Sequence, residues 1–348
     1  MQTYMCGKSS CDKRYYLDSM QTYQVLYLSE VQDFPRPRSG YMILFCFGYF
    51  NILKCGVYCQ KRKRGKAVLS HNHQKKIAVI NDFCGFGKCS ISVSLPIISA
   101  LGIQCCPLPT SIFSNHTGFD SFYYTDFTEH MKAYINEWEK LGLRFDAILT
   151  GFLGSASQID IVKYFFEVFK KEGTIAVIDP VMGDYGKLYP TYSEELASQM
   201  RSLLPYADIL TPNLTEACIL TGSEYDPDMS DSELETLCAE LCRMGPAKIV
   251  ISGLERGDSL TNFIFENGGR STVTEHKVGQ CRSGTGDVFS SIIAADAAAG
   301  MSLNDSVRHA SSFIAKSLRR TVELDIPKTD GICFEEFLTE IGEGAAKT

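Results

Sequence analysis

The sequence lacks three short motifs that commonly mark nucleotide and metal sites. It has no GxxxxGK[ST] phosphate loop, no G-x-G-x-x-G run and no CxxC pair. A Walker-type nucleotide enzyme, a Rossmann-type dehydrogenase and a cysteine-pair zinc site are therefore not expected. Cys238 and Cys242 lie four residues apart on an expected helix, but no His or second cysteine pair has a spacing that would complete a metal site.

Positive charge is scarce outside the first part of the chain. The 348 residues carry a formal net charge of −7, from 34 Lys and Arg against 41 Asp and Glu. Residues 1–74 hold 11 basic and 4 acidic residues, so the remainder holds 23 basic against 37 acidic residues. Because its main part is acidic, we expect no nucleic-acid partner.

Long apolar runs are lacking as well. The run YMILFCFGYFNIL, residues 41–53, is shorter than the roughly 20 residues of a membrane-spanning helix. It precedes the basic block KRKRGK, residues 61–66, so one interpretation is a membrane-surface anchor. The alternative is that residues 1–74 form an extension without a folded role, or follow from a start codon chosen too far upstream. We favour this alternative, and expect no membrane partner.

From Lys75 onward, strand-like and helix-like segments alternate. KKIAVIND predicts a strand, SISVSLPIISALG predicts a helix, and DFTEHMKAYINEWEKLG has apolar residues at helical spacing. Further strand-like runs are DAILTGF, TIAVIDPV, DILTPN and AKIVISGL, and the Asn-Gly-Gly centre of TNFIFENGGRSTVTEH predicts a β-hairpin. The sequence therefore predicts an α/β fold with a mostly parallel sheet, helices on both faces and an antiparallel hairpin at one end.

Polar residues lie in four loops, three of which follow predicted strands, while the fourth is the start of a helix. They lie in the segments Asn81–Gly87, DPVMGDYGKLY (179–189), TPNLTEA (211–217) and GTGD (284–287). Ligands of parallel sheets gather at the carboxyl ends of the strands, so these loops should form one rim. The rim would then hold Asp179, Asp184, Asn213, Glu216 and Asp287, oxygen-bearing side chains of the kind that bind Mg²⁺ directly or through water beside a polyphosphate.

The GTGD segment lies where a loop becomes a helix. Val288, Phe289, Ile292 and Ile293 follow it at helical spacing. The first N–H groups of a helix lack partners and attract anions, so this helix start is a candidate phosphate site. Its small residues and carboxylate also suit an ordinary glycine-rich helix start, because Asp is common in a first turn.

These motifs resemble the ribokinase superfamily. DPVMGD, TPNLTEA and GTGD occur in its order and spacing, and PLPTSIFSNHTGF, residues 107–119, is similar to the substrate loop of its pyridoxal kinase branch. The resemblance covers residues 75–342, which we expect to form a ribokinase-like kinase domain with a three-layer α/β/α architecture. Residues 1–74 are not covered.

The resemblance implies roles for residues at the nucleotide end of the site. Asp287 would be the catalytic base, and Gly284, Thr285 and Gly286 would hold the γ-phosphoryl oxygens through backbone N–H groups. The residues expected to serve ATP are Asp179, Asp184, Asn213, Glu216, Ser252 and Gly253, with Asp179 and Glu216 also at Mg²⁺. Two of these have simpler interpretations, because Asp179 could cap a turn before Pro180 and Glu216 could be an ordinary first-turn acid.

The resemblance also implies a substrate end. Thr110 would lie against the pyridine ring, His116 would close on its polar substituents, and GDYGKLY, which ends at Tyr189, would form a flap. His116 could instead be structural, since SNHTG resembles a turn. Asp82 stands where familiar pyridoxal kinases usually carry Ser, whereas related hydroxymethylpyrimidine kinases have an acid in the comparable loop, so the substrate is left open between the two.

The predicted function is ATP- and Mg²⁺-dependent phosphorylation of the 5′-hydroxymethyl group of pyridoxal, pyridoxine or pyridoxamine in vitamin B6 salvage. One alternative is a hydroxymethylpyrimidine (phosphate) kinase of thiamine synthesis, and another is an inactive vitamin-binding or regulatory protein. The family is often dimeric, so a homodimer is expected. The 14 cysteines mostly have apolar neighbours, which suits reduced thiols in the cytoplasm.

Overall fold

The computed structural model describes residues 44–46, 49–51 and 73–345. The chain divides into two compact units, Met1–Ala67 and Val68–Thr348. In the first unit, β1 (Leu44–Cys46) pairs antiparallel with β2 (Tyr49–Asn51), so the described part of the apolar run is a short hairpin. The basic block at 61–66 lies outside the described residues. The expected domain start at residue 75 stays a prediction.

The second unit is built on a nine-stranded sheet with the order β13-β12-β11-β10-β7-β6-β3-β4-β5. The strands are β3 (Lys76–Cys84), β4 (Gln104–Phe113), β5 (Tyr124–Asp126), β6 (Ala147–Thr150), β7 (Ile175–Ile178), β10 (Ile209–Leu210), β11 (Lys248–Arg256), β12 (Ser259–Glu266) and β13 (Gly269–His276). All pairs from β11 to β4 are parallel, whereas β5, β12 and β13 pair antiparallel. The carboxyl ends of the parallel strands therefore lie along one edge.

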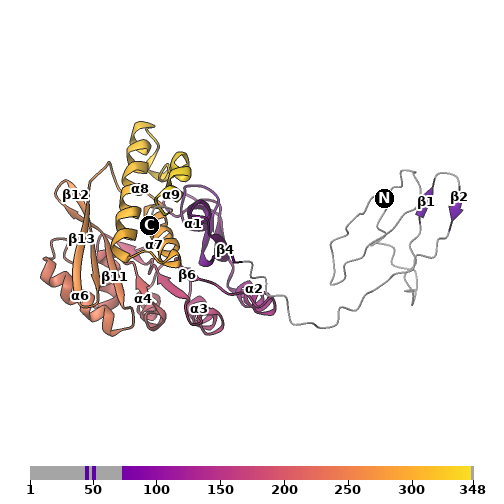
Figure 1. The fold of residues 1–348 in the computed structure, drawn as a ribbon, viewed down its shortest axis with the longest axis horizontal. Coiled ribbons are helices and arrows are strands. Elements are labelled where there is room, and N and C mark those ends of the chain that lie inside the picture. The colour runs from indigo at the N-terminus through magenta and orange to yellow at the C-terminus, as the bar shows by residue number, and fades with distance from the viewer. Residues whose placement is uncertain (1–43, 47–48, 52–72, 346–348) are drawn as a thin grey trace. The chain divides into compact units, whose positions relative to one another are not determined.

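Helices cover both faces of this sheet (Figure 1). One layer holds α1 (Ile91–Ala100), α7 (Thr285–Ala299), α8 (Leu303–Glu323) and α9 (Leu338–Ala345), and the other holds α2 (Thr128–Lys140), α3 (Ala156–Phe169), α4 (Glu194–Met200), α5 (Leu214–Thr221) and α6 (Asp231–Arg243). Short 3₁₀ turns lie at Arg201–Tyr206, Lys328–Asp330 and Glu335–Phe337. The described helices include none long and apolar enough to cross a membrane.

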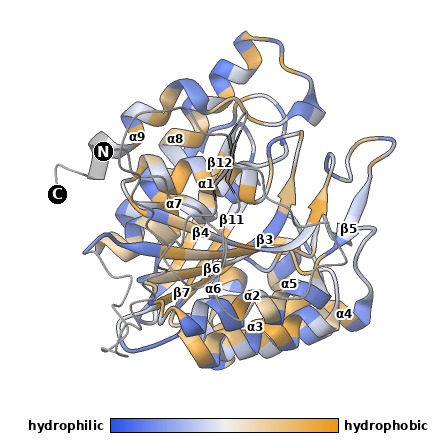
Figure 2. Ribbon diagram, turned by 90° about the vertical axis from the view of Figure 1, so that its right-hand side faces the viewer, coloured by the Kyte–Doolittle hydropathy of each residue, from blue (hydrophilic) through white to orange (hydrophobic). Residues whose placement is uncertain are grey.

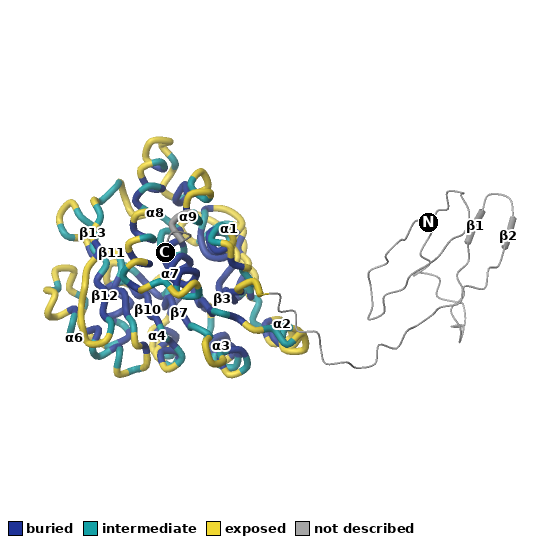
Figure 3. Tube along the Cα trace, in the orientation of Figure 1, coloured by how far each residue is buried: buried dark blue, intermediate teal, exposed yellow. Residues whose placement is uncertain are grey.

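Two apolar clusters, one on each face of the sheet, hold the layers together. The central strands are buried on both faces, so they read as continuous apolar runs, which appear orange in Figure 2 and dark blue in Figure 3. The helices α2 and α8 are amphipathic, with one buried and one exposed side (Figure 3), whereas α5 and the middle of α7 are buried. The predicted three-layer α/β fold with an antiparallel hairpin at one end is confirmed.

The stretch 107–119 differs from the expected loop. Its first half belongs to β4, a ten-residue strand that pairs with β3. Pro107 and Pro109 obscure the strand in the sequence, because proline cannot donate a ladder hydrogen bond. One edge of β4 pairs with β3, and the other edge has no strand partner at Pro107 and Pro109, because β5 pairs only with Ser111–Phe113. Only the second half of the stretch is a loop.

Candidate active site

The start of α7 lies at the carboxyl edge of the sheet. Gly284 is its N-cap residue with φ 85°, and no side chain caps the helix. A Cβ on Gly284 would lie 2.2 Å from the Lys88 carbonyl oxygen, so only glycine fits there. A Cβ on Gly286 would meet nothing within 4 Å, and Thr285 is half-buried, its hydroxyl donating to the Arg282 carbonyl. The first turn therefore faces open space, as an anion site requires.

The Asp287 carboxylate lies in this first turn and is held from two sides. Asn81, near the end of β3, donates from Nδ2 to Asp287 Oδ1 at 3.1 Å. The Ser90 backbone N–H donates to the same carboxylate. Burial raises the pKa of Asp287, and these hydrogen bonds partly oppose the rise because they stabilise the charged form. The carboxylate is thus oriented and more basic than an exposed Asp.

Asp82 lies next to Asp287 and is buried. Burial raises its pKa to about 7, with a smaller contribution from repulsion by Asp287, while a hydrogen bond from the Ser90 side chain lowers it. Ser90 itself has φ 58° and ψ −137°, a conformation that non-glycine residues rarely adopt. Ser90 therefore lies beside both carboxylates and favours the charged form of each.

Asn213 and Glu216 form a capping box at the start of α5. The Asn213 side chain accepts from the Glu216 N–H at 2.9 Å, and Glu216 accepts from the Asn213 N–H at 2.9 Å. Glu216 also accepts from the Met182 N–H at 3.0 Å, and Asn213 donates to the Gly183 carbonyl at 2.8 Å. Glu216 is thus an acid in the first turn of a helix, as the simpler interpretation expects. Asn213 and Glu216 also hold the DPVMGD loop in place.

Asp179 and Glu216 form a second buried carboxylate pair. Burial raises the pKa of Glu216 to about 8, and burial together with repulsion by Glu216 and Asp287 raises the pKa of Asp179. Within residues 73–345, no three His, Cys, Asp or Glu side chains converge as a metal site. Two carboxylates still fit Mg²⁺, which is commonly held by one or two carboxylates plus substrate phosphates and water.

The flap is a short hairpin of β8 (Gly183–Asp184) and β9 (Lys187–Leu188). Asp184 Oδ1 accepts from the Tyr185 N–H at 2.9 Å, and the Gly186 N–H donates to Thr215 in α5 at 2.8 Å. Tyr185 at its tip is 58% exposed. Tyr189 follows the hairpin, and partial burial beside Glu216, Asp184 and Asp179 raises the pKa of its hydroxyl.

Ser252 and Gly253 lie beside the TPNLTEA segment, inside β11. The Ser252 N–H donates to the Pro212 carbonyl at 2.9 Å, and Ser252 forms a parallel bridge with Asn213. Gly253 has φ 70°, and a Cβ there would meet nothing within 4 Å. The strand is irregular at this point, which leaves open space in front of Gly253.

At the substrate end, Thr110 and His116 already have protein partners. Thr110 is fully buried in β4, and its hydroxyl donates to the Phe152 carbonyl at 3.0 Å. His116 Nδ1 accepts from the Gly118 N–H at 3.0 Å, so Nε2 carries the proton donated to the Thr329 carbonyl at 2.7 Å. Both contacts suit the structural interpretation of His116, and the substrate roles of the two residues stay predictions.

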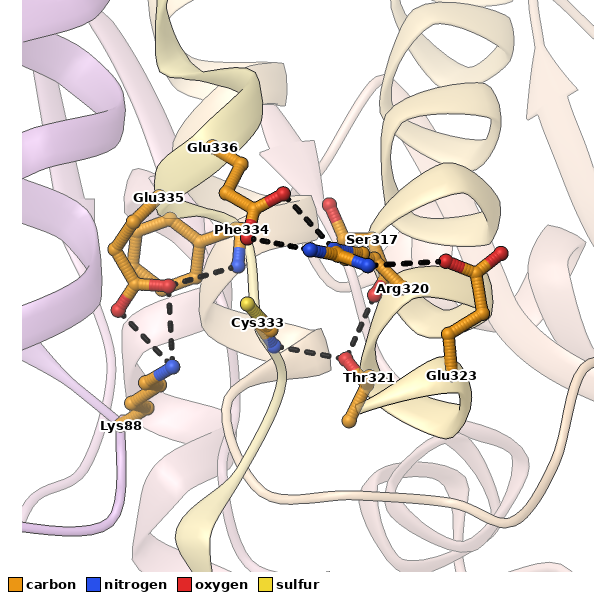
Figure 4. Close-up of polar contacts among 9 residues, drawn as sticks. All are labelled: Lys88, Ser317, Arg320, Thr321, Glu323, Cys333, Phe334, Glu335 and Glu336. Carbon is orange, nitrogen blue, oxygen red and sulfur yellow. Dashed lines mark hydrogen bonds and ion pairs between the residues drawn. The ribbon is translucent and has the colours of Figure 1, made fainter. Parts of the chain in front are cut away.

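The C-terminal segment, residues 326–337, is anchored next to these loops. Arg320 in α8 forms two hydrogen bonds to Glu336, with Nε to Oε2 at 2.9 Å, and Lys88 forms an ion pair with Glu335 at 3.0 Å (Figure 4). A pocket of about 520 Å³ lies between this segment and the loop 84–88. The pocket is lined by Gly85 and Gly87 of the predicted rim segment Asn81–Gly87, but by none of the residues predicted to serve ATP, Mg²⁺ or the substrate.

Reasoning from the sequence missed the positions of Asn81 and Ser90. The sequence pattern places Asn81 in a loop and Ser90 in a helix, whereas in the structure Asn81 lies within β3 and Ser90 is the N-cap residue of α1. The signal for Asn81 is a polar residue at the end of an otherwise apolar strand. Ser90 gives no such signal, because its unusual backbone conformation is visible only in the fold.

The sheet order and the glycine-rich helix start with its carboxylate define a ribokinase-like α/β protein. A family model described as phosphomethylpyrimidine kinase matches residues 91–331. The chain therefore belongs to the phosphomethylpyrimidine kinase family, and the expected likeness to the ribokinase superfamily and its pyridoxal kinase branch is confirmed.

Individual relatives agree with this family. A pyridoxal kinase of Arabidopsis thaliana is 32% identical over 216 residues, which are 56% of this chain and 65% of that protein, slightly under two thirds of its length. A Bacteroides thetaiotaomicron protein described as a phosphomethylpyrimidine kinase is 37% identical with TM-score 0.76, covering 78% of this chain and 94% of that one. The pyridoxal kinase of Lactobacillus plantarum is 26% identical with TM-score 0.71, covering 77% and 96%.

Proposed function

We propose that this protein is a kinase that transfers the γ-phosphoryl group of ATP to the 5′-hydroxymethyl group of pyridoxal, pyridoxine or pyridoxamine. The observation that carries the proposal is the start of α7, where an oriented, half-buried carboxylate lies one residue after a glycine that faces open space. Such a pair supplies a base for an alcohol beside backbone donors for a phosphoryl group. A protein that only binds a vitamin needs no such base.

In this mechanism Asp287 accepts the proton of the hydroxymethyl group as its oxygen attacks phosphorus. The raised pKa of Asp287 brings the carboxylate closer to the proton affinity that a general base needs at neutral pH. The N–H groups of Gly284, Thr285 and Gly286 hold the transferring oxygens, and the absence of a Cβ at Gly286 allows their close approach.

Asp179 and Glu216 would hold Mg²⁺ next to the nucleotide, with Asn213 and Asp184 nearby. When bound, Mg²⁺ neutralises phosphate charge and helps to align the transferring group. A cation there would also relieve the repulsion that raises the pKa of Asp179. Ser252 and Gly253 offer the open backbone edge against which the rest of ATP would lie.

The vitamin B6 substrate is supported by the relatives. Besides the two pyridoxal kinases, the Bacteroides protein was crystallised in a second form with pyridoxal, and that form is 37% identical with TM-score 0.75 over 77% of this chain. We therefore place the vitamin between Asp82, the loop that carries His116, Thr110 and the flap that ends at Tyr189.

A hydroxymethylpyrimidine or phosphomethylpyrimidine kinase is the second candidate. The observation that favours it is Asp82, a buried acid at a position where the resemblance to pyridoxal kinases leads us to expect Ser. A carboxylate at this position suits the amino group of an aminopyrimidine as well as that of pyridoxamine. The matched family model and the Bacteroides protein also carry the phosphomethylpyrimidine kinase description.

The deciding experiment is a coupled ADP-release assay with ATP and Mg²⁺. The purified chain is tested with pyridoxal, pyridoxine, pyridoxamine and hydroxymethylpyrimidine, and mass spectrometry identifies each phosphorylated product. We expect the highest kcat/KM with a B6 alcohol. A preference for hydroxymethylpyrimidine would select the second candidate, and no product with any of the four would contradict both.

We also propose a homodimer in the cytoplasm. The edge strand β5 and the turn before it expose Tyr123, Tyr124 and Phe122 at 71%, 50% and 42%. Exposed aromatic clusters next to an edge strand are frequent in protein interfaces. The nine cysteines among residues 73–345 are all free, as a reducing compartment permits. Sedimentation equilibrium of the purified protein tests the dimer.

A further inference from the structure

Asn81 is buried within β3, three residues before the strand ends, with only 4% of its surface exposed, and both ends of its side-chain amide form hydrogen bonds. Its Oδ1 atom accepts from the Asp82 N–H at 2.9 Å and from the Phe152 N–H at 2.8 Å. Its Nδ2 atom donates to Asp287 Oδ1 at 3.1 Å. The side chain thus joins two loops of the site to the carboxylate on α7.

The orientation of this amide is not ambiguous. The Asp82 and Phe152 N–H groups are obligate donors, so the oxygen of Asn81 must face them. The NH₂ group is then left to face Asp287, which as a carboxylate is an acceptor. The backbone therefore determines which end of Asn81 points at the base.

The surroundings of Asn81 leave room for one conformation. A Cβ on Gly151 would lie 2.4 Å from Asn81 Nδ2 and 2.5 Å from its Cγ, so the absence of a side chain at Gly151 makes space for the amide. Gly151 is itself fixed, since its N–H donates to the Ile80 carbonyl at 2.8 Å. Glycine is needed here for space, because its φ lies outside the left-handed region.

We propose that Asn81 is a positioning residue that orients the Asp287 carboxylate toward the acceptor hydroxyl group. It acts through Asp287 and is not expected to contact the nucleotide. This inference rests on the proposed function, because it assumes that Asp287 is the base. Gly151 has a supporting part, since it permits the position of Asn81.

The test is Asn81→Asp, which has the same shape and keeps an oxygen toward the Asp82 and Phe152 N–H groups. It replaces the N–H donor that faces Asp287 by a carboxyl oxygen, and so also places a second acid next to Asp287. We expect kcat to fall about tenfold or more, the effect of one hydrogen bond to a charged group, while KM for ATP changes less than about twofold. If Asn81 served only the fold, Asn81→Asp would leave kcat intact, and that result would overturn the proposal.

Asn304→Asp is the matched control. Asn304 lies at the start of α8, where it donates to Ser271 at 2.9 Å and accepts from Arg308 at 3.1 Å, away from the site. This control should keep wild-type kcat. Gly151→Ala should reproduce the loss in kcat, because the added methyl group displaces the amide. Unfolding curves of all variants separate loss of fold from loss of turnover.

The double variant Asn81→Asp/Asp287→Asn separates failure of this inference from failure of the proposed function. If Asn81 acts through Asp287, adding Asn81→Asp to Asp287→Asn should cause no further fall in kcat. An additional tenfold fall would overturn the positioning role while leaving the base assigned. If Asp287→Asn alone kept full turnover, the base assignment would fail instead, and the positioning role with it.

Discussion

The two ends of the candidate site are built differently. At the base end, Asn81 and Asp82 are 4% and 6% exposed, and the Asp287 carboxylate is held by Asn81 and Ser90. At the flap end, Tyr185 and Tyr189 are 58% and 37% exposed. The flap strands have only two residues each and are joined to the main body through a few hydrogen bonds.

This difference suits the role that we propose for each end. A base and an anion site work best when they are fixed before the substrate arrives, because no reorganisation is then needed in the transition state. A surface that must admit and release two substrates needs elements with few buried contacts. The base end lowers the stability of the fold in return, because four carboxylates with raised pKa values lie close together there.

The largest expected effect is that of Asp287→Asn at the base end. Loss of the base should lower kcat at least ~10²-fold while the fold and ATP binding persist. Steady-state kinetics and calorimetric titration with ATP measure both. Asp305→Asn, in the first turn of α8, is the control and should behave as wild type. Near-normal turnover of Asp287→Asn would show that Asp287 is not the catalytic base.

The second largest effect concerns Asp82, which lies between the proposed base and the proposed substrate. Asp82→Ser should lower the preference for pyridoxamine over pyridoxal by up to about 1.5–3 kcal/mol, the value of a hydrogen bond to a charged group. Because the pKa of Asp82 is raised to about 7, the wild-type preference should be stronger at pH 8 than at pH 6. The measurement is kcat/KM for both vitamers at both pH values. An unchanged ratio would leave substrate choice to Thr110 and His116.

A third prediction concerns the stability cost of Asp82. Its folded pKa of about 7 exceeds the ordinary value of 3.8 in an unfolded chain. Between these values the folded state binds more protons than the unfolded state, so stability falls as pH rises. Asp82→Asn removes this cost. Its Tm without nucleotide should exceed that of wild type by about 2–4 °C at pH 8, corresponding to roughly 1 kcal/mol, and by less at pH 5.5.

Thermal unfolding at several pH values, with Asp305→Asn as the control, tests this third prediction. Tm curves of wild type and Asp82→Asn that stay parallel from pH 5.5 to pH 8 would contradict it. Such a result would mean that water reaches the Asp82 carboxylate, so that Asp82 would no longer count as part of the buried base end.

The smallest expected effect is that of removing the first unit. Both ends of the site lie within residues 68–348, so a chain that starts at Val68 should keep the Tm and kcat of the full chain. Thermal unfolding and the coupled assay compare the two forms. A fall of more than about 2 °C in Tm, or of twofold in kcat, would show that residues 1–67 contribute to the folded kinase.

Much of the fold could be read from the sequence because the central strands are buried on both faces. Their apolar runs separated by amphipathic helices predict a mostly parallel sheet, and every such strand is present. The strand β4 was missed because Pro107 and Pro109 are poor strand residues unless one edge of the strand is unpaired. Whether that edge is paired depends on β5, which is distant from them in the sequence.

The placement of the residues proposed to serve the nucleotide was predictable for a similar local reason. Asp287 and its glycines are consecutive residues, and Asn213 and Glu216 have the three-residue spacing of a capping box. Asp179 follows its strand directly. In each case short-range spacing and the rule that ligands gather at strand ends were sufficient to place the group at the rim.

The sequence by itself thus determined the layered α/β fold and the residues that carry the proposed chemistry, because both depend on local periodicity and short motifs. Tertiary structure alone decided which groups surround those residues. Asn81 and Asp287 are 206 positions apart, yet they share a hydrogen bond, and Ser90 reaches both Asp82 and Asp287 only through an unusual backbone conformation. Such contacts depend on how layers pack, and burial then sets the pKa values of the carboxylates, which no local pattern encodes.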